Sequence, residues 1–429
     1  MNLLSLPSFI RGPAFLRRRD ILLLPLLRAA ANQNHKPVAI SAEVDSIAGA
    51  EVDLVFKDAD VVVGTHGRSF WILDNITPLR QLSPEVARDP AHLFAPQLTY
   101  RVRRNNNTDT PLPPEEPAGQ NPPDGAMIDY FLNSTMPASA PVTLEIVDAA
   151  SGKVVRHFSS ADKPEPVDVK KLNVPTYWLR PARLLSAAPG MHRFVWNLHY
   201  PAPDVLDHSY PISAIYHDTP RYPLGAAVLP GQYKVVLTAG GKSYTQPLEI
   251  RMDPRVKTSP EELRRQFELD QKIAAALHQD HEALQQVLNL SEQLKSLAGA
   301  PDAIKKASAE LKEKAATLAG GEAGFGAHPL NTPQGRSLSR LNSSFSTMVS
   351  ALDNADAPPT TQQVAMFAEL DKALEEQISA WGQIKSKDIP ALNEQLKKAG
   401  LPPIDLQKIV PNAEDTAETT SQDRDQNEE

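Results

Sequence analysis

The sequence predicts a multidomain α+β protein in which short β-strands come first and helices follow. Its 429 residues exceed the usual size of one domain. Of its 39 prolines, only 10 lie at or after Pro260. Proline interrupts strands and helices, so dense proline marks edges and loops. Apolar residues recur at two-residue spacing before this point and at three- to four-residue spacing after it, which predicts strands and then helices.

The composition excludes several classes of function. The chain has no cysteine, which removes disulfides, thiolate metal sites and thiol nucleophiles. Its 52 acidic and 44 basic residues give a net charge of −8, so there is no overall attraction to nucleic acid. No apolar run reaches the length of a membrane-spanning helix. We therefore expect neither nucleic acid nor a membrane span.

Residues 1–52 are expected to form a basic, irregular leader. Within residues 11–31, Arg17–Arg19 precede the apolar run Ile21–Leu27, and the small residues Ala29–Ala31 follow it. This order is that of an export signal, and the paired arginines also fit a twin-arginine signal. Because the apolar core is short and ends at an arginine, an unstructured basic leader is the alternative.

A β-hairpin is expected between residues 53 and 92. Asp60–Val63 is rich in β-branched residues, Gly64–Arg68 contains two glycines, and Ser69–Leu73 is a second β-rich run. Two such runs around a glycine-containing turn are typical of a hairpin. Two strands alone bury too little apolar surface, so the hairpin needs a larger sheet to join.

Several separated segments carry a family resemblance. They are Val63–Asp74, Thr77–Arg80, Asn121–Tyr130, Gly190–Leu198, Leu229–Tyr233 and Met252–Val256. In this order they resemble the C-terminal portion of sortilin-type BNR-repeat proteins, from the end of the last propeller blade onward. These bacterial proteins are commonly labelled glycosyl hydrolases and are related in fold to xyloglucanase-type β-propellers. The resemblance covers residues 55 to 405 and implies a periplasmic or extracellular location, while the short leader leaves a cytoplasmic one open.

The chain also departs from this family. A propeller has roughly 4–8 blades of about 40–50 residues each, whereas the residues before the hairpin suffice for one blade at most and show no repeat. The aspartate box Ser-x-Asp-x-Gly-x-Thr-Trp is absent, and no residue matches the family's catalytic acids. The resemblance therefore assigns no catalytic residue. Residues 53–92 are expected to be a remnant of the last blade, in a truncated form or a C-terminal piece.

Residues 93–254 are predicted to form a β-sandwich. Val142–Val147 and Tyr233–Thr238 alternate polar and apolar residues, as strands with one buried face do. Ala239–Lys242 supplies a glycine corner, and Leu229–Gly231 opens a strand as in immunoglobulin-like and fibronectin-like modules. Such modules usually serve as spacers or binding platforms.

The histidines of this region raise the question of a metal site. Four histidines and three aspartates lie close together in the sequence: His192, His199, His208, His217, Asp204, Asp207 and Asp218. Zinc prefers compact pairs of ligands, whereas these histidines are 7, 9 and 9 residues apart. We therefore predict no metal and no cofactor, and expect solvated loop histidines. His66 beside Arg68 could contact a sugar or an anion, but a turn facing water is favoured.

No catalytic motif is present. Glycoside hydrolysis needs two carboxylates about 5–9.5 Å apart. Asp124 and Asp129 are the only pair within a matching segment, and turn geometry explains Asp124-Gly125 without chemistry. The chain has no Gly-x-Ser-x-Gly elbow, phosphate loop or His-Glu-x-x-His motif. The ligand-binding residues stay unassigned, and we expect no catalysis.

Residues 259–405 are predicted to form an antiparallel helical bundle. Ser259 is the expected cap of its first helix, with proline next and glutamate at the third helical position. Further helices are predicted over Asp302–Leu318, Gln334–Leu352, from Thr361 to Trp381, and over Ile389–Lys398. A mobile loop is expected over Gly320–Thr332 and an acidic disordered tail over residues 406–429.

Three functions follow from these observations. The first is a non-catalytic C-terminal segment of a secreted BNR/sortilin-type propeller protein, acting in protein or glycan contacts. The alternative is a glycosyl hydrolase acting on β-glucan-type polysaccharide, as the family label implies. The third is a scaffold that completes a propeller encoded by a neighbouring reading frame, because the open edge of a hairpin recruits other strands.

Overall fold

The computed structural model describes most of the chain. The described residues are 10–11, 52–65, 70–103, 122–164, 167–206, 208–211, 218–320 and 330–407. Nearly all of the expected leader and of the acidic tail lies outside them, as does most of the glycine loop after Gly320. His66, Arg68, Asp207 and His217 also lie outside the described residues.

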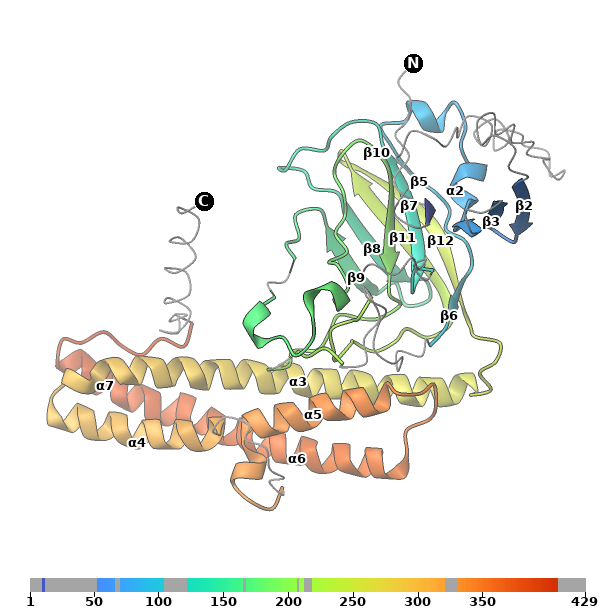
Figure 1. Cartoon of the computed structure of the whole chain (residues 1–429). Helices are drawn as coiled ribbons and strands as arrows, with labels where there is room; N and C mark the ends of the chain where they lie inside the picture. Colours follow the sequence, from blue (N-terminus) through green and yellow to red (C-terminus); the bar gives the residue numbers. More distant parts are fainter. Residues whose placement is uncertain are drawn as a thin grey trace. The chain divides into compact units, whose positions relative to one another are not determined.

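The described residues contain both sheets and helices, which confirms the expected mixed α+β content. The chain divides into two units. Unit 1 comprises residues 1–201, 210–221 and 227–257, and it holds the strands. Unit 2 comprises residues 202–209, 222–226 and 258–429, and it holds the long helices (Figure 1). The chain therefore enters unit 2 twice before the helices begin.

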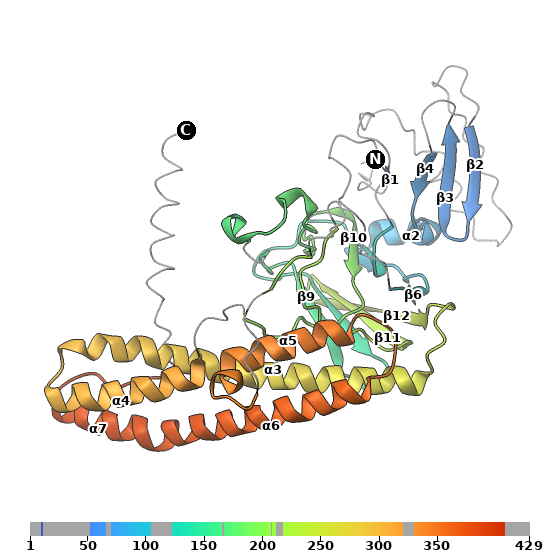
Figure 2. The same ribbon diagram turned by 60° about the horizontal axis from the view of Figure 1, so that its bottom comes forward.

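Unit 1 begins with a four-stranded antiparallel sheet. Its strands are β1 (Ile10–Arg11), β2 (Val52–Lys57), β3 (Asp60–Thr65) and β4 (Phe70–Leu73), in the order β1-β4-β3-β2. The predicted hairpin is confirmed as β3–β4, whereas β2 is a strand that the sequence pattern did not single out. Figure 2 shows β2, β3 and β4 side by side.

Two further sheets share one hydrophobic core in unit 1. The first has the order β10-β7-β5, formed by β5 (Ala91–Leu93), β7 (Ala126–Leu132) and β10 (Gly190–Trp196). The second has the order β6-β12-β11-β8-β9, formed by β6 (Thr99–Arg101), β8 (Thr143–Asp148), β9 (Val154–Ser159), β11 (Gly231–Ala239) and β12 (Lys242–Met252). Ile128 and Trp196 of the three-stranded sheet and Val235 of the five-stranded sheet lie in this core. The predicted strand runs around Val142–Val147 and Tyr233–Thr238 are confirmed.

The turn before β7 requires a glycine. Gly125 has a φ of +125°, and a Cβ atom at this position would lie 1.9 Å from the carbonyl oxygen of Trp196. No L side chain fits that space, so the close approach of two strands explains Gly125. The Asp124-Gly125 pair thus has a structural reason, as the sequence suggested.

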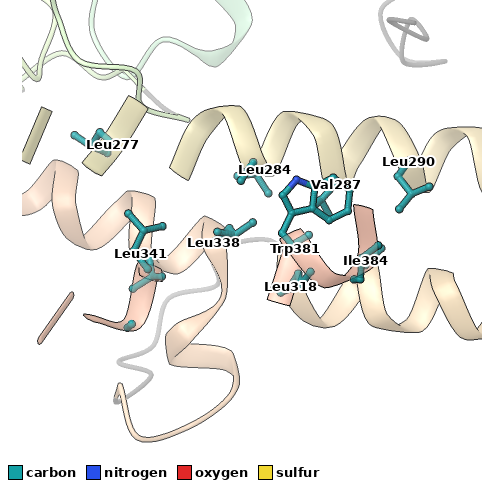
Figure 3. Close-up of a cluster of buried hydrophobic side chains, with 14 of the residues drawn as sticks. Leu277, Leu284, Val287, Leu290, Leu318, Leu338, Leu341, Trp381 and Ile384 are labelled. Carbon is teal, nitrogen blue, oxygen red and sulfur yellow. The ribbon is translucent and has the colours of Figure 1, made fainter. Parts of the chain in front are cut away.

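The helices of unit 2 share a second core. They are α3 (Pro260–Lys295), α4 (Asp302–Ala319), α5 (Leu338–Leu352), α6 (Thr361–Gln383) and α7 (Ile389–Lys398). Figure 3 shows Trp381 and Ile384 among leucines of α3 and α4, and Trp381 is fully buried. The predicted helix positions are confirmed, except that α5 begins at Leu338. The preceding residues, Gln334–Arg336, form a 3₁₀ turn instead.

Helix α3 begins with a capping box. The Ser259 hydroxyl accepts a hydrogen bond from the backbone N–H of Glu262, and the Glu262 carboxylate accepts one from the backbone N–H of Ser259 at 2.9 Å. We expect Ser259→Ala to lower the unfolding free energy of unit 2 by about 1 kcal/mol, because an N–H of the first turn loses its acceptor. Urea denaturation followed by circular dichroism at the helical band measures this change. Ser259→Thr, which keeps the hydroxyl, is the control, and equal stability of both variants would contradict the prediction.

Candidate interaction surface

The histidines considered for a metal site have partners of their own. The Nε2 of His192 lies 2.7 Å from the carbonyl oxygen of Ala188, and the Nδ1 of His199 lies 2.6 Å from that of Asn197. The carboxylates nearby form ion pairs: Asp204 with His278 at 2.8 Å and Asp218 with Arg180 at 2.7 Å. Across the described ranges, no three His, Cys, Asp or Glu side chains are placed to hold a metal ion.

Asp129 of the candidate carboxylate pair is committed to a buried ion pair. Its carboxylate accepts hydrogen bonds from Nε and Nη2 of Arg193, at 2.8 and 3.2 Å. The side chain of Asp129 is 3% exposed. Burial raises the pKa of this carboxyl group, and the charge of Arg193 opposes the rise. A carboxylate held in this way supports the fold and has no free face toward a substrate.

Arg193 also connects the four-stranded sheet β1-β4-β3-β2, called the first sheet below, to the rest of unit 1. Its Nη1 and Nη2 donate to the carbonyl oxygens of Asp74 and Asn75, each at 3.0 Å. These two residues directly follow β4, and Arg193 lies opposite Asp129 in the β7–β10 register. No local sequence pattern distinguishes Arg193, although it lies in the resembling segment Gly190–Leu198. Only the register of strands distant in sequence could have paired it with Asp129.

The first sheet has one covered face. Alternate residues of its strands, Leu54, Val61, Val63 and Leu73, pack with the buried Ile76 and Leu79. Leu79 belongs to the single-turn helix α2 (Thr77–Arg80). Strand side chains alternate between faces, so the neighbouring residues must point to the other side of the sheet.

The other face of this sheet exposes a row of apolar side chains, with Asp53 at one end and Lys57 and Asp60 at the other. It carries Val55, Val62 and Ile72, which lie opposite one another across β2, β3 and β4, and Phe70, which lies opposite Gly64. The side chain of Phe70 is 74% exposed, that of Val55 53% and that of Ile72 41%. We call these four residues the apolar face. Single exposed apolar residues are ordinary, whereas a contiguous group across three strands is typical of an interaction surface.

The edge of the sheet adds to this surface. Strand β2 ends the order β1-β4-β3-β2, so within the described part of the chain one side of its backbone has no neighbouring strand. An open edge can pair with a strand of another chain, and an apolar face can pack on another sheet about 10 Å away. The arrangement suits binding to a β-sheet.

No protein-family model matches the chain, and no curated protein matches it. None of the helices in the described ranges is both long and apolar enough to cross a membrane.

Proposed function

We propose that this chain is a non-catalytic segment of a secreted BNR/sortilin-type propeller protein and binds another β-sheet through the apolar face. The supporting observation is that one side of the first sheet is packed while the other exposes Val55, Phe70 and Ile72. Sheets of globular domains normally bury an apolar face against a second layer. A partner sheet would supply that layer here.

The proposal includes a finer description of the fold. The first sheet would be the remnant of the last propeller blade, since a blade has four strands and Val63–Asp74 of the resembling segments includes all of β4. The two sheets that share a core would be an immunoglobulin-like sandwich, and α3 to α7 an antiparallel helical bundle. Their shared cores and antiparallel strand pairs support this description.

Geometry favours a protein sheet over a glycan as the occupant. The apolar face consists of aliphatic side chains and one phenylalanine at two-residue spacing, which matches the spacing of side chains on a facing sheet. Glycan sites combine aromatic rings with convergent polar groups, whereas the described residues of this side have one aromatic ring, Phe70, and carry polar side chains only at its two ends. The expected partner is the sheet of a propeller that lacks its last blade.

Binding to such a propeller tests the proposal. The probe is a sortilin-type propeller from which the last blade has been deleted, titrated with the full chain in a calorimeter. We expect the double variant Phe70→Glu/Ile72→Glu to weaken binding at least tenfold, since it places two charges in the apolar contact. Val169→Glu is the matched control, because Val169 is 63% exposed in unit 1 and lies outside the first sheet. Absence of binding by the unmodified chain, or equal binding by both variants, would overturn the proposal.

The glycosyl hydrolase alternative needs a pair of free carboxylates across a cleft. Asp129 is committed to Arg193, so the described residues offer no support for it. Release of reducing sugar from xyloglucan or β-glucan by the pure chain, above the level of a denatured sample, would favour this alternative.

A further inference from the structure

A short segment between strands belongs to the helical unit. Ala202–Ser209 lies in unit 2, although Pro201 before it and Tyr210 after it lie in unit 1. Val205, in the middle of this segment, is buried in the core that the helices form. The helices therefore bury part of this segment in their own core.

Asn342 on α5 is the main attachment. Its Oδ1 accepts a hydrogen bond from the backbone N–H of Leu206 at 2.9 Å, and its Nδ2 lies 3.4 Å from the carbonyl oxygen of Asp204. The same Nδ2 donates to Oδ2 of Asp280 on α3 at 2.9 Å. Asn342 is almost completely buried. One amide thus connects the segment to α3 and α5 together.

Asp280 is an unusual group in this position. Its side chain is fully buried, and its Oδ1 atom has no hydrogen-bond partner among the described residues. Burial raises the pKa of Asp280 to about 7, and the hydrogen bond from Asn342 only partly opposes the rise. Burial thus favours the protonated carboxyl group, and among the described residues Asn342 is the one donor to its charged form.

An exposed pair of titratable side chains, His278 and Asp204, also attaches the segment to α3. The Nδ1 of His278 lies 2.8 Å from Oδ2 of Asp204, and both side chains are exposed. This hydrogen bond raises the pKa of His278 above its ordinary value. Glu282, one turn further along α3, adds a weaker attraction at 3.7 Å. Protonated His278 therefore attracts the segment through Asp204.

We propose that Asp280, Asn342 and His278 form a proton-dependent clasp that holds residues 202–206 on the helices at low pH and releases them as pH rises. When Asp280 loses its proton, the buried charge needs more donors than Asn342 provides. The Nδ2 of Asn342 also reaches the carbonyl oxygen of Asp204, so a charged Asp280 competes with the segment for this donor. When His278 loses its proton, the ion pair with Asp204 disappears. Both titrations weaken the clasp in the same direction.

Other charged groups in this part of unit 2 do not replace these contacts. Arg336 and Glu376 form an ion pair with each other at 2.6 Å. Arg340, two residues before Asn342, has an interaction of its own. The titratable and charged groups on these elements include His278, His281 and Glu282 on α3, Asp204 on the segment, Arg336 before α5, Arg340 on α5, and Glu376 on α6.

Hydrogen exchange of the full chain tests the clasp. Amide protection in the peptide that contains Val205 and Leu206 is measured at about pH 6 and about pH 8.5, corrected for the intrinsic pH dependence of exchange. We expect protection to fall at least tenfold between these pH values. Asp280→Asn, which stays neutral, should keep most of its protection at the higher pH. Glu268→Gln, an exposed carboxylate on the same helix, should behave like the unmodified chain.

The exposed partner gives an independent measurement. His278→Gln leaves the core untouched and should reduce protection of the same peptide at about pH 6, where the histidine carries its charge. The proposal is overturned if the unmodified chain shows equal protection at both pH values. It is also overturned if Asp280→Asn loses as much protection as the unmodified chain.

Discussion

Arg193→Met is expected to lower the unfolding free energy of unit 1 by about 3 to 5 kcal/mol, because it leaves the charge of Asp129 buried without its partner. Both residues are largely buried and meet through two hydrogen bonds. The variant also removes the donors to the carbonyl oxygens of Asp74 and Asn75, which anchor the end of the first sheet. Guanidinium denaturation of the full chain, followed by tryptophan fluorescence, measures the loss.

A double variant and a control variant show whether the loss of stability comes from the buried ion pair or from the removal of any arginine charge. Asp129→Asn combined with Arg193→Met removes the uncompensated charge and should recover part of the lost stability. Arg251→Met is the matched control, since Arg251 forms an exposed pair with Glu249 at 2.7 Å. An exposed pair of this kind contributes at most about 1 kcal/mol. A loss below that value for Arg193→Met would show that the buried pair does not anchor the sheet.

Asp280→Asn is expected to raise the unfolding free energy of unit 2 by about 2 to 4 kcal/mol at pH 8 and to change it little at pH 4. The amide fills the same space, accepts the hydrogen bond from Asn342 and carries no charge to bury. A buried polar substitution that stabilises a protein is uncommon, so this result would be specific to the raised pKa of Asp280.

The sign of the pH dependence follows from the two pKa values. Unfolded Asp280 titrates near 3.8 and folded Asp280 at about 7. Between these values the folded state binds more protons, so stability is greatest at low pH and falls until the pH passes about 7. The raised pKa of His278 acts in the same sense but contributes little because its side chain is exposed.

Urea denaturation at pH 5 and pH 8, followed by circular dichroism at the helical band, measures this dependence. The unmodified chain should lose stability between the two pH values, and Asp280→Asn should lose much less. Glu268→Gln, whose carboxylate is exposed, should follow the unmodified chain. Equal losses in all three proteins would rule out Asp280 as the titrating group.

The helices could be predicted from the sequence because their signals are local. Ser259 and Glu262 form the expected capping box, and α4 ends next to Gly320, which has a φ of +78°. Helix α5 starts four residues after the predicted Gln334, because Gln334–Arg336 form a 3₁₀ turn, and such turns are frequent at the ends of α-helices.

The contacts between distant segments could not be predicted in this way. The hairpin β3–β4 followed from its glycine-containing turn, but the exposed face appears only when the register with β2 is known. The pair Asp129–Arg193 depends on the register of β7 and β10. Asp280 had an available signal, because it lies three residues after Leu277 and four before Leu284 on the buried side of α3. An aspartate in that stripe indicates a buried carboxyl group.

Site-specific photo-crosslinking tests the central claim most directly. A benzophenone side chain replaces Ile72 on the apolar face, or Val169 as the control, and each full-length protein is irradiated with the propeller that lacks its last blade. Contact through the apolar face predicts a crosslink from position 72 to strand residues of that propeller and none from position 169. Equal crosslinking from both positions, or none from position 72, would contradict binding through this face.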